Sequence, residues 1–130
     1  MIASGADIHV LRDPTRGGLG ASLNEIARSS SVGIRILEQQ VPVTDLVANA
    51  CSLLGLDPLY VANEGKLVCF VAQTEADRVL EAMRRHELGR NASVIGTCVN
   101  DHRGIVVART RLGADRIVDL PIGEQLPRIC

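Results

Sequence analysis

The chain has 130 residues, of which 46% are hydrophobic and only 2% aromatic, and its formal net charge is −1. This length is that of one domain with a core of its own. The near-neutral charge and the scarcity of aromatic rings for base stacking exclude nucleic acid as a partner. No apolar run approaches the ~20 residues of a membrane helix, and no secretory signal opens the sequence, so a cytoplasmic protein is expected.

Hydrophobic spacing predicts alternating strands and helices in the first two thirds of the chain. A strand is expected at residues 8–11, a helix at 18–30 and a strand at 32–36. A second helix is expected to open near Pro42 and Thr44 and to end at Gly55, before a strand at 67–72. Residues 74–77 resemble a capping box and predict the start of a third helix.

The last third of the chain is predicted to be rich in strands. These are expected at residues 92–99, 105–109 and 116–120, with 101–104 as a hairpin loop between the first two. Interleaved helices followed by clustered strands favour an α+β fold, a mixed β-sheet with packed helices. Residues 1–120 are expected to form the domain. Residues 121–130 are expected to be a flexible tail, since Pro121, Gly123 and Pro127 oppose regular structure.

The four cysteines lie far apart in the sequence, at Cys51, Cys69, Cys98 and Cys130. Their spacing does not match a zinc site, so no metal is predicted. Cys51, Cys69 and Cys98 lie in apolar stretches and are predicted to be small buried residues. Cys130 ends the predicted tail and is the cysteine placed to react. The alternative is a frayed terminus with an incidental thiol.

Two further segments are candidates for chemistry. Residues 13–18 form a glycine-rich turn before a helix, where Gly17, Gly18 and Arg16 favour contact with a phosphate group. The alternative is an ordinary turn in which Asp13 or Thr15 caps the helix. Glu64 precedes a glycine at the start of an apolar strand. It is either a general base, if it is buried, or a solvated turn residue.

Three segments together resemble the signatures of the hydrogenase expression/formation protein HypE family. They are Asp-Pro-Thr-Arg-Gly-Gly-Leu at residues 13–19, Ala-Asn-Glu-Gly-Lys at 62–66 and Pro-Arg-Ile-Cys at 127–130. The glycine-rich turn is shared more loosely across the aminoimidazole-ribonucleotide-synthetase superfamily, whereas the cysteine-terminated tail is diagnostic of HypE. The resemblance covers the whole chain. It implies the superfamily's C-terminal domain fold, which is a three-layer arrangement with partly ferredoxin-like topology.

The resemblance also implies a function in the maturation of [NiFe]-hydrogenases. In this family the carbamoyltransferase HypF places a carboxamide on the terminal cysteine, here Cys130. ATP-dependent dehydration then makes a thiocyanate, and its cyanide passes to iron on a HypC–HypD complex. The resemblance implies Cys130 and Glu64 as catalytic residues, with Glu64 as the base. The implied cofactor-binding residues are Asp13, Thr15, Arg16, Gly17 and Gly18.

Family members carry an N-terminal domain that supplies most of the Mg–ATP site and the cleft of a homodimer, and nothing in this sequence resembles it. The chain is therefore expected to correspond to the C-terminal domain, to hold no cofactor by itself and to be inactive alone. The alternative function is that of a non-catalytic nucleotide- or partner-binding domain. Such a domain would belong to another superfamily member, of the selenophosphate synthetase or thiamine-phosphate kinase type.

Overall fold

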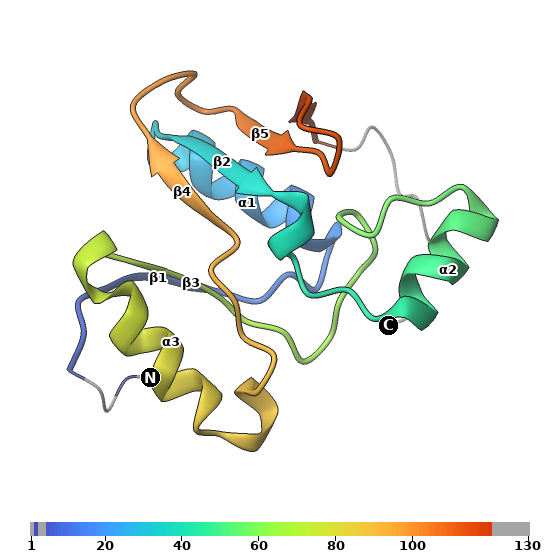
Figure 1. Cartoon of the computed structure of the whole chain (residues 1–130). Helices are drawn as coiled ribbons and strands as arrows, with labels where there is room; N and C mark the ends of the chain where they lie inside the picture. The colour runs from blue at the N-terminus through green and yellow to red at the C-terminus, as the bar shows by residue number, and fades with distance from the viewer. Residues whose placement is uncertain (1, 3–4, 121–130) are drawn as a thin grey trace.

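The computed structural model describes residues 2 and 5–120, so Cys130 and the predicted tail lie outside the described residues (Figure 1). The predicted order of strands and helices is confirmed, with ends that differ by a few residues. The elements are β1 (Ile8–Arg12), α1 (Gly18–Ser29), β2 (Gly33–Leu37), α2 (Asp45–Leu54), β3 (Val68–Val71), α3 (Ala76–Arg84), β4 (Gly96–Val99), β5 (Val106–Arg109) and β6 (Asp115–Val118). Short 3-10 turns lie at Glu38–Gln40, Gln73–Glu75 and Glu87–Gly89.

The strands form a four-stranded sheet and a separate two-stranded ribbon. The sheet has the order β4-β2-β5-β6, and β2 pairs with β5 in parallel but with β4 antiparallel. β1 and β3 form the antiparallel ribbon. In Figure 1 α1 lies behind the four-stranded sheet, and α2 stands at the edge of the molecule. The expected α+β class with a mixed sheet is confirmed.

The hairpin predicted at residues 101–104 is wrong. β4 and β5 do not pair with each other, because β2 lies between them. The loop therefore passes around the end of β2, where the Gly104 amide donates to the Val32 carbonyl at 2.9 Å. The hairpin of this region joins β5 to β6 instead. Two apolar runs with a short polar loop between them fit either connection, so spacing alone does not distinguish them.

The hydrophobic core lies between α1 and the inner face of the four-stranded sheet. It is formed by Leu23, Ile26, Ala27, Ile34, Ile36, Leu59, Val106, Ala108 and Val118. Asn24 is also buried, and its side-chain amide donates to the carbonyls of Gly20 (2.9 Å) and Val118 (2.7 Å). These bonds satisfy a buried polar group and tie α1 to β6. Within the described part of the chain, none of the helices combines the length and hydrophobicity needed to cross a bilayer.

Two local predictions are wrong. α3 does not begin with a capping box, because a 3-10 turn precedes it and its N-cap, Glu75, makes no side-chain capping bond. Cys98 is exposed rather than buried, because it lies on the edge strand β4. Cys51 is buried as predicted. Cys69 is half-buried, and burial raises the pKa of its thiol.

Candidate functional site

The glycine-rich turn joins β1 to α1 through two consecutive left-handed residues. Gly17 has φ +64° and Gly18 has φ +65°, a region that residues with a β-carbon rarely adopt. Gly17 is the N-cap of α1, and no side chain of the described residues makes a capping bond there. The alternative in which Asp13 or Thr15 caps the helix is therefore wrong. Instead the Thr15 hydroxyl donates to the Asp13 carboxylate, with Oγ1 and Oδ2 3.0 Å apart.

Gly18 also lacks the space for a side chain. A β-carbon at this position would lie 2.6 Å from the Leu59 carbonyl oxygen and 2.7 Å from that of Val61. A β-carbon at Gly20 would lie 2.7 Å from Cε1 of the Tyr60 ring. The first turn of α1 therefore packs directly against residues 59–61.

Two backbone hydrogen bonds hold this contact in place. The Gly20 amide donates to the Leu59 carbonyl at 2.7 Å, and the Asn63 amide donates to the Pro14 carbonyl at 3.3 Å. The turn at 13–18 and the segment at 62–66 are far apart in the sequence but adjacent in the structure. The fold thus brings together two of the three segments singled out from the sequence. The third, residues 127–130, lies outside the described residues.

The start of α1 offers donors for an anion. Gly20 and Ala21 donate to the carbonyls of Leu59 and Gly17, but the amides of Gly18 and Leu19 have no hydrogen-bond partner among residues 2 and 5–120. Arg16 is exposed and forms no ion pair within the same residues. Free amides at a helix start and a nearby cation favour a phosphate group. Phosphate binding at this turn stays a prediction.

No set of metal-binding carboxylates is evident among the described residues. In the described part of the chain, no group of three His, Cys, Asp or Glu side chains is arranged to hold a metal ion.

Glu64 lies in the turn before β3, is exposed and makes no ion pair or hydrogen bond within the described residues. Its neighbour Asn63 holds it beside the glycine-rich turn. The burial that a general base at Glu64 requires is not provided by the described residues.

A cluster of ion pairs at the start of the loop that carries Leu59 was not predicted from the sequence. Nη2 of Arg116 lies 2.7 Å from Oδ2 of Asp57, and Nε of Arg116 contacts the Glu38 carboxylate. Burial lowers the pKa of Arg116, but hydrogen bonds to Glu38 and Asp57 outweigh it, and the net shift is upward. Burial, and then the Asp57 charge, raise the pKa of Tyr60. No sequence signal marks this cluster, because its members come from three distant segments.

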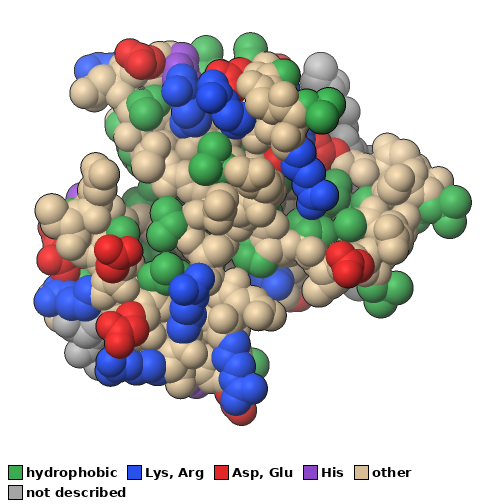
Figure 2. All heavy atoms as spheres, viewed as in Figure 1, with side chains coloured by type: hydrophobic (Ala, Val, Ile, Leu, Met, Phe, Trp, Pro, Cys, Tyr) green, Lys and Arg blue, Asp and Glu red, His purple; other side chains and the backbone are tan. Residues whose placement is uncertain are grey.

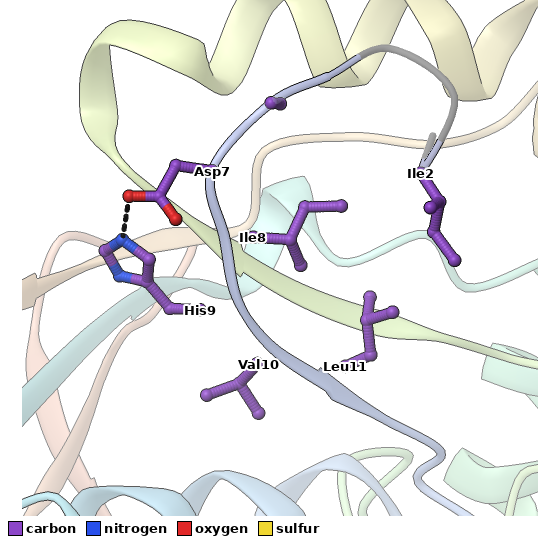
Figure 3. A pocket seen from close by; sticks show the side chains of 7 residues that line it. Ile2, Asp7, Ile8, His9, Val10 and Leu11 are labelled. Carbon is purple, nitrogen blue, oxygen red and sulfur yellow. Dashed lines mark hydrogen bonds and ion pairs between the residues drawn. The ribbon is translucent and has the colours of Figure 1, made fainter.

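One cavity formed by the described residues lies away from this site. It is an open pocket of about 520 Å³ along β1, where His9 Nε2 lies 3.3 Å from Asp7 Oδ2 (Figure 3). None of the predicted site residues lines it. A smaller cavity of about 160 Å³ is lined by the ion-pair cluster and by Leu59. The candidate site is therefore a surface junction, not a closed pocket.

Comparison with known proteins identifies the family. Residues 1–109 match the family model described as AIR synthase related protein, C-terminal domain. The chain belongs to this family. The superfamily and the fold that the sequence resemblance implied are thereby confirmed.

Among members of the AIR synthase related family, the chain is similar to HypE proteins, which confirms the resemblance found in the sequence. It is 55% identical over 130 residues to carbamoyl dehydratase HypE of Azotobacter vinelandii, covering 100% of this chain and 38% of that protein. A structure of hydrogenase maturation protein HypE in complex with ATP matches with TM-score 0.87 and 50% identity, over 95% of this chain and 38% of that one. The HypE–HypF complex matches with TM-score 0.83 and 46% identity, over 88% and 37%. The chain thus spans well under half the length of these relatives.

Proposed function

We propose that this chain is the cysteine-bearing part of a HypE-type carbamoyl dehydratase, in which Cys130 carries the group that becomes the cyanide ligand of hydrogenase iron. The observation that best supports this function is the junction between the glycine-rich turn and the Glu64 turn. Asn63 and Pro14 join them at 3.3 Å, in a chain 55% identical to a carbamoyl dehydratase. A phosphate-binding turn beside a carboxylate is what dehydration of an amide requires.

The glycine-rich turn is proposed to bind the phosphates of ATP. ATP supplies the phosphoryl group that makes the amide oxygen of the Cys130 thiocarboxamide a leaving group. The free amides of Gly18 and Leu19 and the Arg16 guanidinium provide positive charge for phosphate oxygens. Gly17 supplies the left-handed backbone, at φ +64°, with which the turn enters α1. Asp13 and Thr15, whose side chains are hydrogen-bonded to each other, complete the set of proposed cofactor-binding residues.

Glu64 is proposed as the base. When a thiocarboxamide becomes a thiocyanate, its carbon loses oxygen and its nitrogen loses two protons, so a proton acceptor near the phosphate site is needed. Glu64 is exposed in this chain. We propose that the remaining part of the longer protein covers it and supplies the ligands for magnesium. The isolated chain is accordingly expected to be inactive.

The partners and setting proposed for the chain follow the family. A solved complex of a related HypE with HypF supports a HypF-type carbamoyltransferase as the donor to Cys130. Delivery to a HypC–HypD complex, a homodimer of the longer protein and a cytoplasmic location are proposed from the sequence resemblance.

Carbamoylation of Cys130 tests the proposal directly. The chain is mixed with a HypF-type carbamoyltransferase, carbamoyl phosphate and ATP, and its intact mass is measured. We expect a gain of one carbamoyl group that is lost in Cys130→Ala. Cys98→Ala is the matched control. It removes another exposed thiol and should leave the gain of mass unchanged. A gain that survives Cys130→Ala would contradict the proposal.

The dehydration step is tested in a chimera in which this chain replaces its counterpart in the Azotobacter vinelandii relative. With ATP, the carbamoyl adduct should lose the mass of one water. Glu64→Gln should slow this loss by about 10²–10⁴-fold, the usual contribution of a general base. An unchanged rate would exclude Glu64 as the base. If neither the chain nor the chimera gains a carbamoyl group, a non-catalytic binding domain is the better description.

A further inference from the structure

We infer that Arg116, Asp57 and Glu38 are positioning residues that set the placement of Glu64 relative to the glycine-rich turn. The inference rests on the proposed function of that site. It concerns the loop of residues 57–63, which lies between the ion-pair cluster and the two functional segments. Within the described residues, none of the three side chains forms a hydrogen bond or ion pair with either segment, so they would act through the loop.

The first link runs from the sheet to the loop. Arg116 lies on β6 opposite Ala108, and Glu38 directly follows β2, so both are carried by the four-stranded sheet. The Arg116 guanidinium bonds Glu38 through Nε and Asp57 through Nη2. Asp57 uses its other oxygen, Oδ1, to accept the Leu59 amide at 2.9 Å. One carboxylate thus joins the sheet to the loop backbone.

The second link runs from the loop to the site. Leu59 is 5% exposed, and its carbonyl accepts the Gly20 amide in the first turn of α1. Four residues later the Asn63 amide donates to Pro14, and Glu64 follows. A β-carbon at Gly18 would lie 2.6 Å from the Leu59 oxygen, so the loop and the helix are in close backbone contact. A displaced loop would therefore move the Glu64 turn away from the glycine-rich turn.

A role in positioning is distinguishable from a role in stability. The side chains of Arg116, Glu38 and Asp57 are 36%, 24% and 29% exposed, and ion pairs near the surface add little to global stability. Arg109 and Asp115 form a second ion pair on the same β5–β6 hairpin, with Nε and Oδ1 2.8 Å apart. No hydrogen bond connects that pair to the loop within the described residues. Asp115→Asn is therefore the matched control.

The first test measures amide hydrogen exchange in this chain by NMR. In Asp57→Ala and Arg116→Met, the Leu59 and Gly20 amides should exchange about tenfold faster than in the wild type, because local opening becomes easier. Asp115→Asn should leave both rates unchanged. Equal rates in Asp57→Ala, Arg116→Met and the control would overturn the inference.

The second test uses the chimera with the Azotobacter vinelandii relative and follows ATP-dependent dehydration. Arg116→Met should lower kcat about 10–100-fold with little change in KM for ATP, since misplacement of reacting groups acts on the chemical step. Arg116→Lys should recover part of the loss, and melting temperatures should match that of Asp115→Asn. A kcat equal to that of the control would overturn the inference. If the wild-type chimera is inactive, the proposed function fails, and the exchange rates still decide the positioning.

Discussion

The helices α1 and α2 both carry an apolar face in the sequence, yet the fold treats them very differently. α1 buries eight of its twelve residues, whereas α2 buries only Cys51 of its ten. Leu46, Leu53 and Leu54 of α2 are 81%, 87% and 69% exposed. Figure 2 shows hydrophobic side chains projecting from the α2 edge of the molecule. Hydrophobic spacing thus indicates that a helix has an apolar face, but not whether this chain covers it.

The ends of the two helices differ in the same way. α2 is bounded by local chemistry, because the Thr44 hydroxyl accepts the Val47 amide at 3.5 Å and Gly55 ends the helix at φ +68°. α1 begins without a side-chain cap, and its first turn is held by Leu59 from a distant loop. α2 therefore depends mainly on its own sequence, and α1 on tertiary contacts. This difference can be tested with paired substitutions.

The largest effect is expected from truncating a leucine in each helix. Leu23 is 1% exposed in the core, so Leu23→Ala should lower the free energy of unfolding by about 2–5 kcal/mol. Leu53 is 87% exposed, so Leu53→Ala should change it by less than about 0.5 kcal/mol. Urea denaturation of both variants measures the difference. A large loss in Leu53→Ala would show that something covers α2 in solution.

A smaller effect is expected at the two left-handed glycines that bound the helices. Alanine at φ near +65° costs about 1–2 kcal/mol of strain at either Gly18 or Gly55. At Gly18 the Leu59 backbone adds a clash of about 1–3 kcal/mol, whereas none of the described residues lies within 4 Å of a β-carbon at Gly55. Denaturant unfolding should therefore show Gly18→Ala as the less stable variant. Equal stabilities would mean that the loop yields to the new methyl group.

The smallest effect concerns pH at the α1 junction. Burial, followed by the Asp57 charge, raises the pKa of Tyr60 above its ordinary value of 10.0. Because the folded state holds the phenol proton more tightly, this contribution to stability is fully present below pH 10.0. It is lost as the pH rises through the folded pKa. Unfolding free energies of wild type and Tyr60→Phe from pH 8 to 11 should show this additional loss only in the wild type. Parallel curves would contradict it.

The candidate site was only partly predictable. The glycine-rich turn and Glu64 stand out in the sequence by residue type, but their adjacency depends on the Asn63–Pro14 hydrogen bond. The sequence likewise does not determine the exposure of Glu64, because a turn residue is covered or solvated according to what packs over it. Arg116 and its carboxylate partners carry no motif, so only the folded chain shows them as a cluster.

By itself, the sequence determined the order of strands and helices and the α+β class, and it marked the segments that we propose to carry chemistry. These depend on short-range properties, namely hydrophobic period, glycine and proline positions, and local motifs. The tertiary structure decided that β2 separates β4 from β5, that α1 is buried while α2 is not, and that the loop at 57–63 joins the two functional segments. Those features depend on which distant residues meet, and pairing between distant segments leaves no periodic trace in a single sequence.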